Sequence, residues 1–297
     1  MIIRRQEELT DAVLAVMERT EDPRLRQIMI ALIRHLHAFV REVRLTEAEF
    51  QEATAILNKM GKLTSDTHNE MVLMAGSLGV SSLVCLLNNG DQGATETSQS
   101  LLGPFWRMRS PRVENGGSIV RSETPGPPLF ARFRVEDRAG GPIAGAEVDI
   151  WHSSPVGLYE NQDPEQAEMN LRGKFTTDAD GRIWFRSVKP AGYPIPTDGV
   201  VGRLLRAQNR HPYRPAHVHA LVFKEGYKTL TSQVYADDDP NLDTDVQFGV
   251  TRALVGRFER HDEPHPEGPS VATPWYSLDY TFVMEPGEAR LPRPPIK

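Results

Sequence analysis

The stretch Arg214-Pro-Ala-His-Val-His-Ala-Leu-Val-Phe223 indicates the fold more directly than any other part of the sequence. After its proline it becomes an apolar run with β-branched residues, which predicts a strand over 217–223 that is buried in a domain core. Side chains two apart on a strand project from the same face, so His217 and His219 can converge on one point. The pair is either a metal chelate or two core histidines, and the stretch alone favours neither.

A second histidine pair with the same spacing serves as an internal comparison. His35 and His37 lie within 23–43, where apolar residues recur at helical spacing. Residues two apart on a helix do not face each other. Only the pair in the predicted strand can therefore bind one ion.

The first hundred residues have the pattern of amphipathic helices. Asp22, followed by a proline, is the expected N-cap of a helix over 23–43. The Thr-x-x-Glu sequences at 46–49 and 67–70 match capping boxes and predict the starts of two more helices, the first of which stops at Gly61. Helices this short need something to pack against.

From about residue 124 the pattern has a period of two, which is typical of strands with one buried face. Alternating runs lie at 131–135, 146–150 and 276–282, and turn signals lie at 137–142, 178–181 and 224–226. Short strands separated by regular turns predict an antiparallel β-sandwich. The sequence therefore predicts an α+β protein, with a helical domain over 1–100 and a β-sandwich over 101–297.

Composition narrows the class of protein. The chain has 297 residues, of which 39% are hydrophobic and 25% charged, as in an ordinary globular protein. A net charge of -6 gives no general footprint for nucleic acid. One cysteine excludes an internal disulfide framework and a cysteine-rich metal site. With no leader and no apolar run of about twenty residues, we expect a soluble cytoplasmic protein that does not enter a membrane.

Two of the seven tyrosines are candidates for further metal ligands. Tyr159 follows the run at 146–151 through a Pro-Val-Gly loop, and Tyr193 lies in the proline-rich segment 190–196. A strongly Lewis-acidic ion lowers the pKa of a phenol, and trivalent iron suits an oxygen anion. The residue types permit a set made of these two tyrosines with His217 and His219 but do not select it.

Four separated motifs have the order found in a known family. They are Trp151-His-Ser-Ser-Pro-Val-Gly-Leu-Tyr159, Gly192-Tyr-Pro-Ile-Pro196, Arg214-Pro-Ala-His-Val-His219 and Thr231-Ser-Gln-Val-Tyr235. Together they resemble the intradiol ring-cleavage dioxygenases, which open catechols between the two hydroxyl-bearing carbons with non-haem ferric iron. Leu101-Leu-Gly-Pro-Phe-Trp106 and the helical N-terminal part resemble the catechol and hydroxyquinol 1,2-dioxygenase branch. The resemblance covers nearly the whole chain.

The resemblance implies a role for each motif residue. One Fe(III) per subunit would be held by Tyr159, Tyr193, His217 and His219. Arg214 would lie beside the substrate and stabilise negative charge on the ring, and Gln233 would assist by hydrogen bonding near the metal. Tyr193 would also accept a proton from the incoming diol.

The substrate that the resemblance favours is hydroxyquinol (1,2,4-trihydroxybenzene), opened with O2 to 3-hydroxy-cis,cis-muconate or its tautomer maleylacetate. Catechol, giving cis,cis-muconate, is the alternative, because relatives carry a pocket leucine and, three residues on, an aspartate, where this chain has Leu73 and Gly76. The pocket candidates are Leu73, Gly76, Leu102, Gly103, Pro104, Phe105, Phe248 and Gly249. Core packing suits the apolar ones equally well.

The same resemblance implies a homodimer formed through the N-terminal helices. The pattern by itself indicates only that these helices carry more apolar surface than they can bury alone. Whether phospholipid binds at the dimer interface, as in some relatives, is left open.

Three alternatives compete with this interpretation. The segments 141–148 and 177–181 also resemble transthyretin-like modules, which bind and do not catalyse. A zinc hydrolase or cupin would add a third histidine, chosen from His152, His211, His261 and His265. The acidic run 237–245 suggests calcium, but it lacks the glycine and closing glutamate of an EF-hand loop, so a solvated turn is expected.

Overall fold

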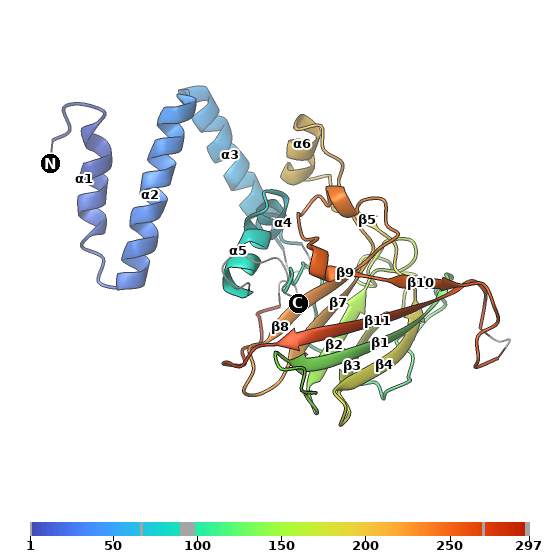
Figure 1. Cartoon of the computed structure of the whole chain (residues 1–297). Helices are drawn as coiled ribbons and strands as arrows, with labels where there is room; N and C mark the ends of the chain where they lie inside the picture. Colours follow the sequence, from blue (N-terminus) through green and yellow to red (C-terminus); the bar gives the residue numbers. More distant parts are fainter. Residues whose placement is uncertain (1, 66–67, 90–98, 269–270, 295–297) are drawn as a thin grey trace. The chain divides into compact units, whose positions relative to one another are not determined.

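The computed structural model describes residues 2–65, 68–89, 99–268 and 271–294 (Figure 1). The chain divides into two compact units, residues 1–59 and 60–297. The first holds α1 (Glu8–Met17), α2 (Pro23–Val43) and most of α3 (Glu47–Leu63). The second holds α4 (Glu70–Ser77), α5 (Val80–Asn89), α6 (Val200–Ala207) and all the strands.

Helix starts follow the capping residues in the sequence. The Asp22 carboxylate accepts hydrogen bonds from the N–H groups of Arg24 and Leu25, which confirms it as the N-cap of α2. Before α3, Thr46 N–H donates to Glu49 (2.8 Å) and Glu49 N–H donates to the Thr46 hydroxyl (3.3 Å), as a capping box requires. Helix α1 was not predicted, because no side chain caps its first turn.

The third apolar segment forms two helices where one was predicted. The N-cap of α4 is Asn69, whose side chain accepts from Val72 N–H, and the expected start at Thr67 lies outside the described residues. The break before α5 falls at Gly79, whose φ of +71° few side-chain-bearing residues adopt. No single helix in the described ranges could span a membrane, although α4 and α5 together pass that test of length and composition, bent by 76°.

Two sheets form the body of the second unit (Figure 1). The four-stranded sheet has the order β10 (Phe258–His261), β11 (Trp275–Met284), β1 (Pro128–Asp137) and β4 (Arg182–Val188). The five-stranded sheet has the order β3 (Arg172–Thr176), β2 (Glu147–His152), β7 (His217–Phe223), β8 (Leu230–Ala236) and β9 (Val255–Gly256). A short pair joins β5 (Tyr193–Pro194) to β6 (Tyr213–Arg214). Side chains from both larger sheets share one core, which confirms the sandwich.

Not every strand pair is antiparallel. β11 runs parallel to β1, and β9 runs parallel to β8. Parallel neighbours need long connections, and β11 meets this condition because residues 138–274 lie between β1 and β11 in the chain. The alternating pattern of β11 was visible in the sequence, but its partner and direction were not.

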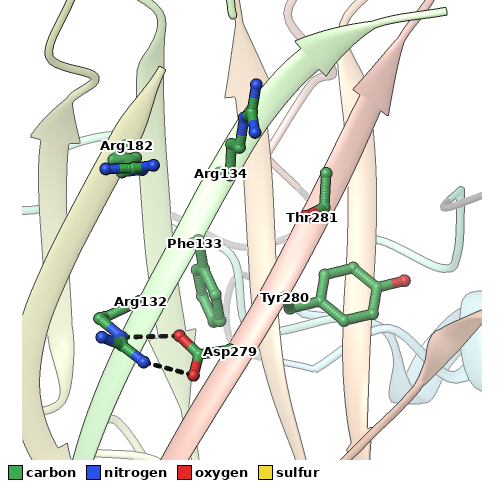
Figure 2. Close-up of a pocket in the computed structure, with 7 residues that line it drawn as sticks. All are labelled: Arg132, Phe133, Arg134, Arg182, Asp279, Tyr280 and Thr281. Atoms are coloured by element: carbon green, nitrogen blue, oxygen red, sulfur yellow. Dashed lines mark hydrogen bonds and ion pairs between the residues drawn. The ribbon is translucent and has the colours of Figure 1, made fainter. Parts of the chain in front are cut away.

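The outer face of the four-stranded sheet carries a hollow of about 360 Å³ (Figure 2). There Arg132 of β1 makes two hydrogen bonds with Asp279 of β11, and Arg134 lies opposite Arg182 of β4. Phe133 between the two arginines is buried, because successive residues of a strand face opposite ways. This hollow therefore lies on the far side of the sandwich from the outer face of the five-stranded sheet.

The outer face of the five-stranded sheet is buried as well as its inner face. On β7 the residues 218, 220 and 222 enter the sandwich core, and the alternate residues His217, His219 and Leu221 face the other way, yet all six are buried. The register places His219 beside Trp151 of β2 and Gln233 of β8. A sheet covered on both faces can thus hold polar side chains away from solvent.

Candidate active site

The two predicted histidines converge on one point. Nε2 of His217 lies 3.1 Å from Nε2 of His219, and each residue is 1% exposed. His217 donates from Nδ1 to the Pro215 carbonyl (2.7 Å), which leaves its Nε2 lone pair facing His219. Burial, and then the Arg214 charge, lower the pKa of His217 to about 3; burial also lowers the pKa of His219 well below its ordinary value. Both rings are therefore neutral and able to bind a metal ion.

The two predicted tyrosines complete the cluster. The hydroxyls of Tyr159 and Tyr193 lie 3.3 Å apart, and both residues are buried. The Tyr193 ring lies 5.6 Å from that of His217, and the Tyr159 ring lies 6.3 Å from that of His219. Burial raises the pKa of both phenols, with the Arg214 charge opposing it. The structure thus brings together the four residues that the sequence analysis grouped.

The chemistry of this donor set fits a hard trivalent ion. It offers two neutral imidazole nitrogens and two phenols that only a strongly Lewis-acidic ion would ionise at neutral pH in so buried a place. Within the described ranges no three histidine, cysteine, aspartate or glutamate side chains lie close enough to hold a metal. The zinc alternative therefore lacks its third ligand there.

The other histidines have separate partners. His152 contacts the Ser153 carbonyl (2.7 Å) and the Ser187 hydroxyl (2.7 Å) through its two ring nitrogens. On the four-stranded sheet side, His261 stacks on Trp275 and His265 stacks on Phe130. His211 accepts a hydrogen bond from the Tyr213 N–H.

Arg214 is buried beside this cluster and not in a surface ion pair. It is 2% exposed, and its Nε and Nη2 each lie 3.2 Å from a different Asp245 oxygen. Nη2 also donates to Gln233 Oε1 (2.9 Å) and to the Tyr235 hydroxyl (2.6 Å). Nη1 lies 3.4 Å from His217 Nε2. The guanidinium thus lies next to the point where the two histidines converge.

Gln233 links the arginine to the chain segment that covers the site. Its Oε1 accepts hydrogen bonds from Arg214 and from the Tyr235 hydroxyl, and its Nε2 donates to the Leu101 carbonyl (2.6 Å). Because Gln233 is fully buried, all these bonds form away from water. The residue holds the start of the predicted pocket segment against the sheet.

Four of the eight pocket candidates lie against the cluster or against Arg214. Gly103 has φ +73°, and a Cβ there would lie 3.1 Å from Cε1 of His219. The Phe105 ring lies 4.5 Å from that of Tyr159, and Leu102 packs into the same aromatic cluster. A Cβ on Gly249 would come within 3.0 Å of Arg214 Nη2.

The other four candidates lie in different surroundings. Leu73 packs with apolar side chains of α6 in a separate cluster, as expected of a core residue. A Cβ on Gly76 would lie 3.0–3.3 Å from the Gln247 side chain. Phe248 is 54% exposed, with the Arg210 guanidinium 4.8 Å from its ring. Pro104 is half-buried.

Several residues of the site were not singled out from the sequence. The Trp151 ring is stacked on His219, with centroids 4.6 Å apart and planes 7° apart. Nδ1 of His219 has no hydrogen-bond partner among the described residues, so the stacking on Trp151 helps to orient this ring where a hydrogen bond does not. The buried Arg172 pairs with Glu160 (2.7 Å) and donates to the Phe105 carbonyl (2.7 Å). The period-two pattern would have given the register of Trp151 only if the partner strand had been known.

The acidic run 237–245 is only partly the solvated turn that was expected. Asp239 accepts the N–H groups of Ala216 and Asn241 (2.8 Å each), and Asp238 pairs with Lys189. Asp245 is 4% exposed and pairs with Arg214. Its carboxylate was assigned to solvent because a run of acidic residues gives no sign that one of them is buried.

Comparison with known proteins agrees with the site. The family model for the dioxygenase domain matches residues 101–286, and that for the catechol dioxygenase N terminus matches residues 22–95. A hydroxyquinol 1,2-dioxygenase of Rhizobium sp. (strain MTP-10005) is 39% identical over 283 residues, 94% of this chain and 95% of that protein.

Solved structures give the same result. Hydroxyquinol 1,2-dioxygenase from Pseudomonas putida DLL-E4 matches with a TM-score of 0.85 and 37% identity, covering 95% of this chain and 98% of that one. Catechol 1,2-dioxygenase from Pseudomonas arvilla C-1 matches with a TM-score of 0.81 and 28% identity, covering 97% and 96%. Fold and domain models together define a dioxygenase with a helical N-terminal part. The chain belongs to the intradiol ring-cleavage dioxygenase family, as its motifs indicated, and is an enzyme and not a transthyretin-like binding module.

Proposed function

We propose that the protein is an Fe(III)-dependent dioxygenase that opens hydroxyquinol with O2 to 3-hydroxy-cis,cis-muconate or maleylacetate. The observation that carries the proposal is a buried cluster in which two neutral histidines meet at Nε2, two tyrosine hydroxyls lie 3.3 Å apart with their rings beside the histidines, and a buried arginine lies next to the pair. Hydroxyquinol is favoured because the chain is similar to hydroxyquinol dioxygenases in both sequence and structure.

In this proposal the four residues would hold the ion through His217 Nε2, His219 Nε2 and the two phenolate oxygens. When bound, ferric iron supplies a Lewis acid that makes the ring of a coordinated diol reactive towards O2. A neutral diol that binds as a dianion must lose two protons. The Tyr193 phenolate oxygen can accept one because burial raises its pKa, and a solvent hydroxide would accept the other.

Arg214 and Gln233 would act on the bound substrate by electrostatics and position. Nη1 of Arg214 points towards the histidine pair, so its positive charge would stabilise negative charge on the ring. Gln233 keeps Nη2 and the Leu101 carbonyl in place. The covering segment 101–106 and the sandwich would exclude water, which strengthens these interactions.

Catechol is the second candidate substrate, favoured by a specific observation. Gly76 has no carboxylate to accept a hydrogen bond from the third hydroxyl of hydroxyquinol, and the Gln247 side chain lies against it. A site that bonds a substrate hydroxyl can discriminate by about 10⁴-fold or more. The preference between the two diols is therefore a measurable property of this pocket.

An anaerobic titration followed by visible absorption tests both the iron site and the substrate. We expect a broad tyrosinate-to-iron band in the iron-loaded protein, shifted by hydroxyquinol at lower concentration than by catechol. Tyr193→Phe should weaken the band, whereas the control Tyr213→Phe, at a tyrosine that is 44% exposed, should not. An iron-loaded protein without the band, inert to both diols, contradicts the proposal.

We also propose that residues 1–100 form a dimerisation domain and 101–297 the catalytic domain. On α2, apolar side chains at seven positions are 43–52% exposed: Leu25, Ile28, Leu32, Leu36, Phe39, Val40 and Val43. Such a stripe favours a partner. Light scattering should give the mass of a dimer, and Leu32→Glu should yield monomers while Arg34→Glu, on the same helix, does not.

Native mass spectrometry would decide whether phospholipid is bound, and cell fractionation would test the predicted cytoplasmic location.

A further inference from the structure

The buried carboxylate of Asp245 accepts hydrogen bonds from two parts of the site, the guanidinium of Arg214 and the backbone of the loop 245–249. Its Oδ1 accepts from Arg214 Nε and from Gln247 N–H, each at 3.2 Å. Its Oδ2 accepts from Arg214 Nη2 (3.2 Å) and from Gly249 N–H (2.9 Å). One carboxylate thus joins the arginine to the loop 245–249.

These contacts leave one arm of Arg214 for the reaction. Nε and Nη2 are occupied by Asp245, Gln233 and the Tyr235 hydroxyl. Nη1 lies 3.4 Å from Nε2 of His217, and the guanidinium also interacts with the Tyr193 hydroxyl, whose pKa it lowers against the effect of burial. Because a guanidinium is planar and rigid, fixing two of its nitrogens fixes the direction of the third. The direction points at the place where the diol would bind.

The same carboxylate shapes the loop that packs on the arginine. The hydrogen bond from Gly249 N–H brings this glycine so close that a Cβ would lie 2.6 Å from the Tyr235 hydroxyl and 3.0 Å from Arg214 Nη2. Phe248 before it adopts φ +53°, which a side-chain-bearing residue rarely does. The surrounding structure must therefore hold the loop in this form, and Asp245 supplies two of its hydrogen bonds.

We propose that Asp245 is the positioning residue for Arg214: it fixes the guanidinium so that Nη1 faces the bound diol, and it holds the loop 245–249 against the same arginine. This inference rests on the proposed function. Burial alone would raise the pKa of Asp245, but the Arg214 charge and the N–H groups of the loop hold it below its ordinary value, so the pair is ionised at neutral pH. Misplacing a catalytic group by about 1 Å can cost about 10²-fold in rate.

The test compares Asp245→Asn with Asp239→Asn in the iron-loaded enzyme. Asparagine has the same shape but replaces one acceptor oxygen with a donor, so it cannot hold both arginine nitrogens. We expect kcat/KM to fall by about 10²-fold while the iron band of the resting enzyme is unchanged. Asp239 also accepts two backbone N–H groups but does not contact Arg214, and its variant should lower only the melting temperature.

A double-mutant cycle shows whether Asp245 acts through Arg214. In the Arg214→Ala background, Asp245→Asn should reduce kcat/KM by less than about 3-fold, because the group it positions is gone. Losses that multiply independently overturn the proposal, as does an Asp245→Asn enzyme that works as well as the wild type. A wild type with no iron band and no turnover would instead contradict the proposed function.

Arg214→Lys provides a second route if Asp245→Asn does not fold. Lysine keeps the charge but cannot present one nitrogen while two others are held. If orientation matters, Arg214→Lys should lose nearly as much kcat/KM as Arg214→Ala, with little change in KM for the diol. If Arg214→Lys retains most of the activity, charge alone is sufficient and Asp245 is not a positioning residue.

Discussion

Acid should destabilise the metal-free protein, because the second unit buries three neutral histidines. Burial lowers the pKa of His152 to about 4 and that of His217 to about 3, and lowers the pKa of His219 well below its ordinary value. The unfolded chain protonates each histidine near pH 6.5. Since the folded-state values are lower, the stability contributed by each histidine is present above about pH 6.5 and is lost as pH falls below it.

The size of this loss of stability depends mainly on the pKa values of the histidines in the unfolded chain. Between pH 7 and pH 5 each histidine lowers the free energy of unfolding by about 2 kcal/mol, or about 6 kcal/mol for three. Asp149 has the opposite effect. Burial raises its pKa to about 6, so the folded protein takes up a proton between pH 7 and pH 5, which stabilises it by about 1 kcal/mol. A net loss of about 5 kcal/mol is comparable to the whole stability of many domains.

Urea unfolding of metal-free protein at pH 7 and pH 5 measures this difference. All four tryptophans, at 106, 151, 184 and 275, lie within 60–297, so their fluorescence reports on that unit. The pH dependence should shrink by about 2 kcal/mol in His152→Gln. Iron-loaded protein should lose at least as much, because its unfolded chain takes up the same histidine protons and also reprotonates the phenolates that held the metal. Equal stability at the two pH values would refute the reasoning.

Three further variants test the packing of the site. Gly103→Ala should lose about 1–3 kcal/mol of stability and retain less iron, because it adds backbone strain at φ +73° and a contact with His219. The control Gly140→Ala, at φ +80° with nothing near its Cβ, adds strain alone. Melting curves and iron content compare the two variants. Trp151→Leu should lower the free energy of unfolding, measured by chemical denaturation, by about 2–4 kcal/mol and shift the visible band, because it removes the ring stacked on His219. The control Trp184→Leu, at a tryptophan that is 41% exposed, should lower it by less than about 1 kcal/mol. Glu70→Gln should lower stability by about 1–3 kcal/mol in the same assay, because the buried Glu70 carboxylate accepts Val201 N–H at the start of α6 and lies 2.6 Å from His68 Nε2.

Elements whose signals are local were predictable from the sequence. The strand 217–223 and the helix 23–43 have the predicted bounds, because alternation, helical spacing and the Asp22 cap depend only on neighbouring residues. Asp149 marks the limit of this reasoning. It alternates with Val148 and Ile150 like a solvent-facing residue but is buried, because the outer face of β2 is covered by the segment that carries Trp106, whose indole donates to it.

The four candidate ligands could be grouped in advance only because their motifs resemble a family; their residue types merely permitted the set. Asp245 and the stacking of Trp151 could not be predicted. Asp245 becomes important through a loop that returns to Arg214 from thirty-one residues away. The stacking of Trp151 on His219 depends on the register between β2 and β7, which cannot be read from a single sequence.

The register also explains why the motifs belong together. Trp151, His219 and Gln233 come from three motifs that are far apart in the chain, yet they are neighbours in one row across β2, β7 and β8. Trp151 orients the His219 ring, and Gln233 holds the arginine that faces the histidines. A shift of one residue in either strand pair would turn a member of the row into the sandwich core. Core packing that fixes the register therefore also assembles the site, so a variant that loosens the core should lose iron before it loses secondary structure.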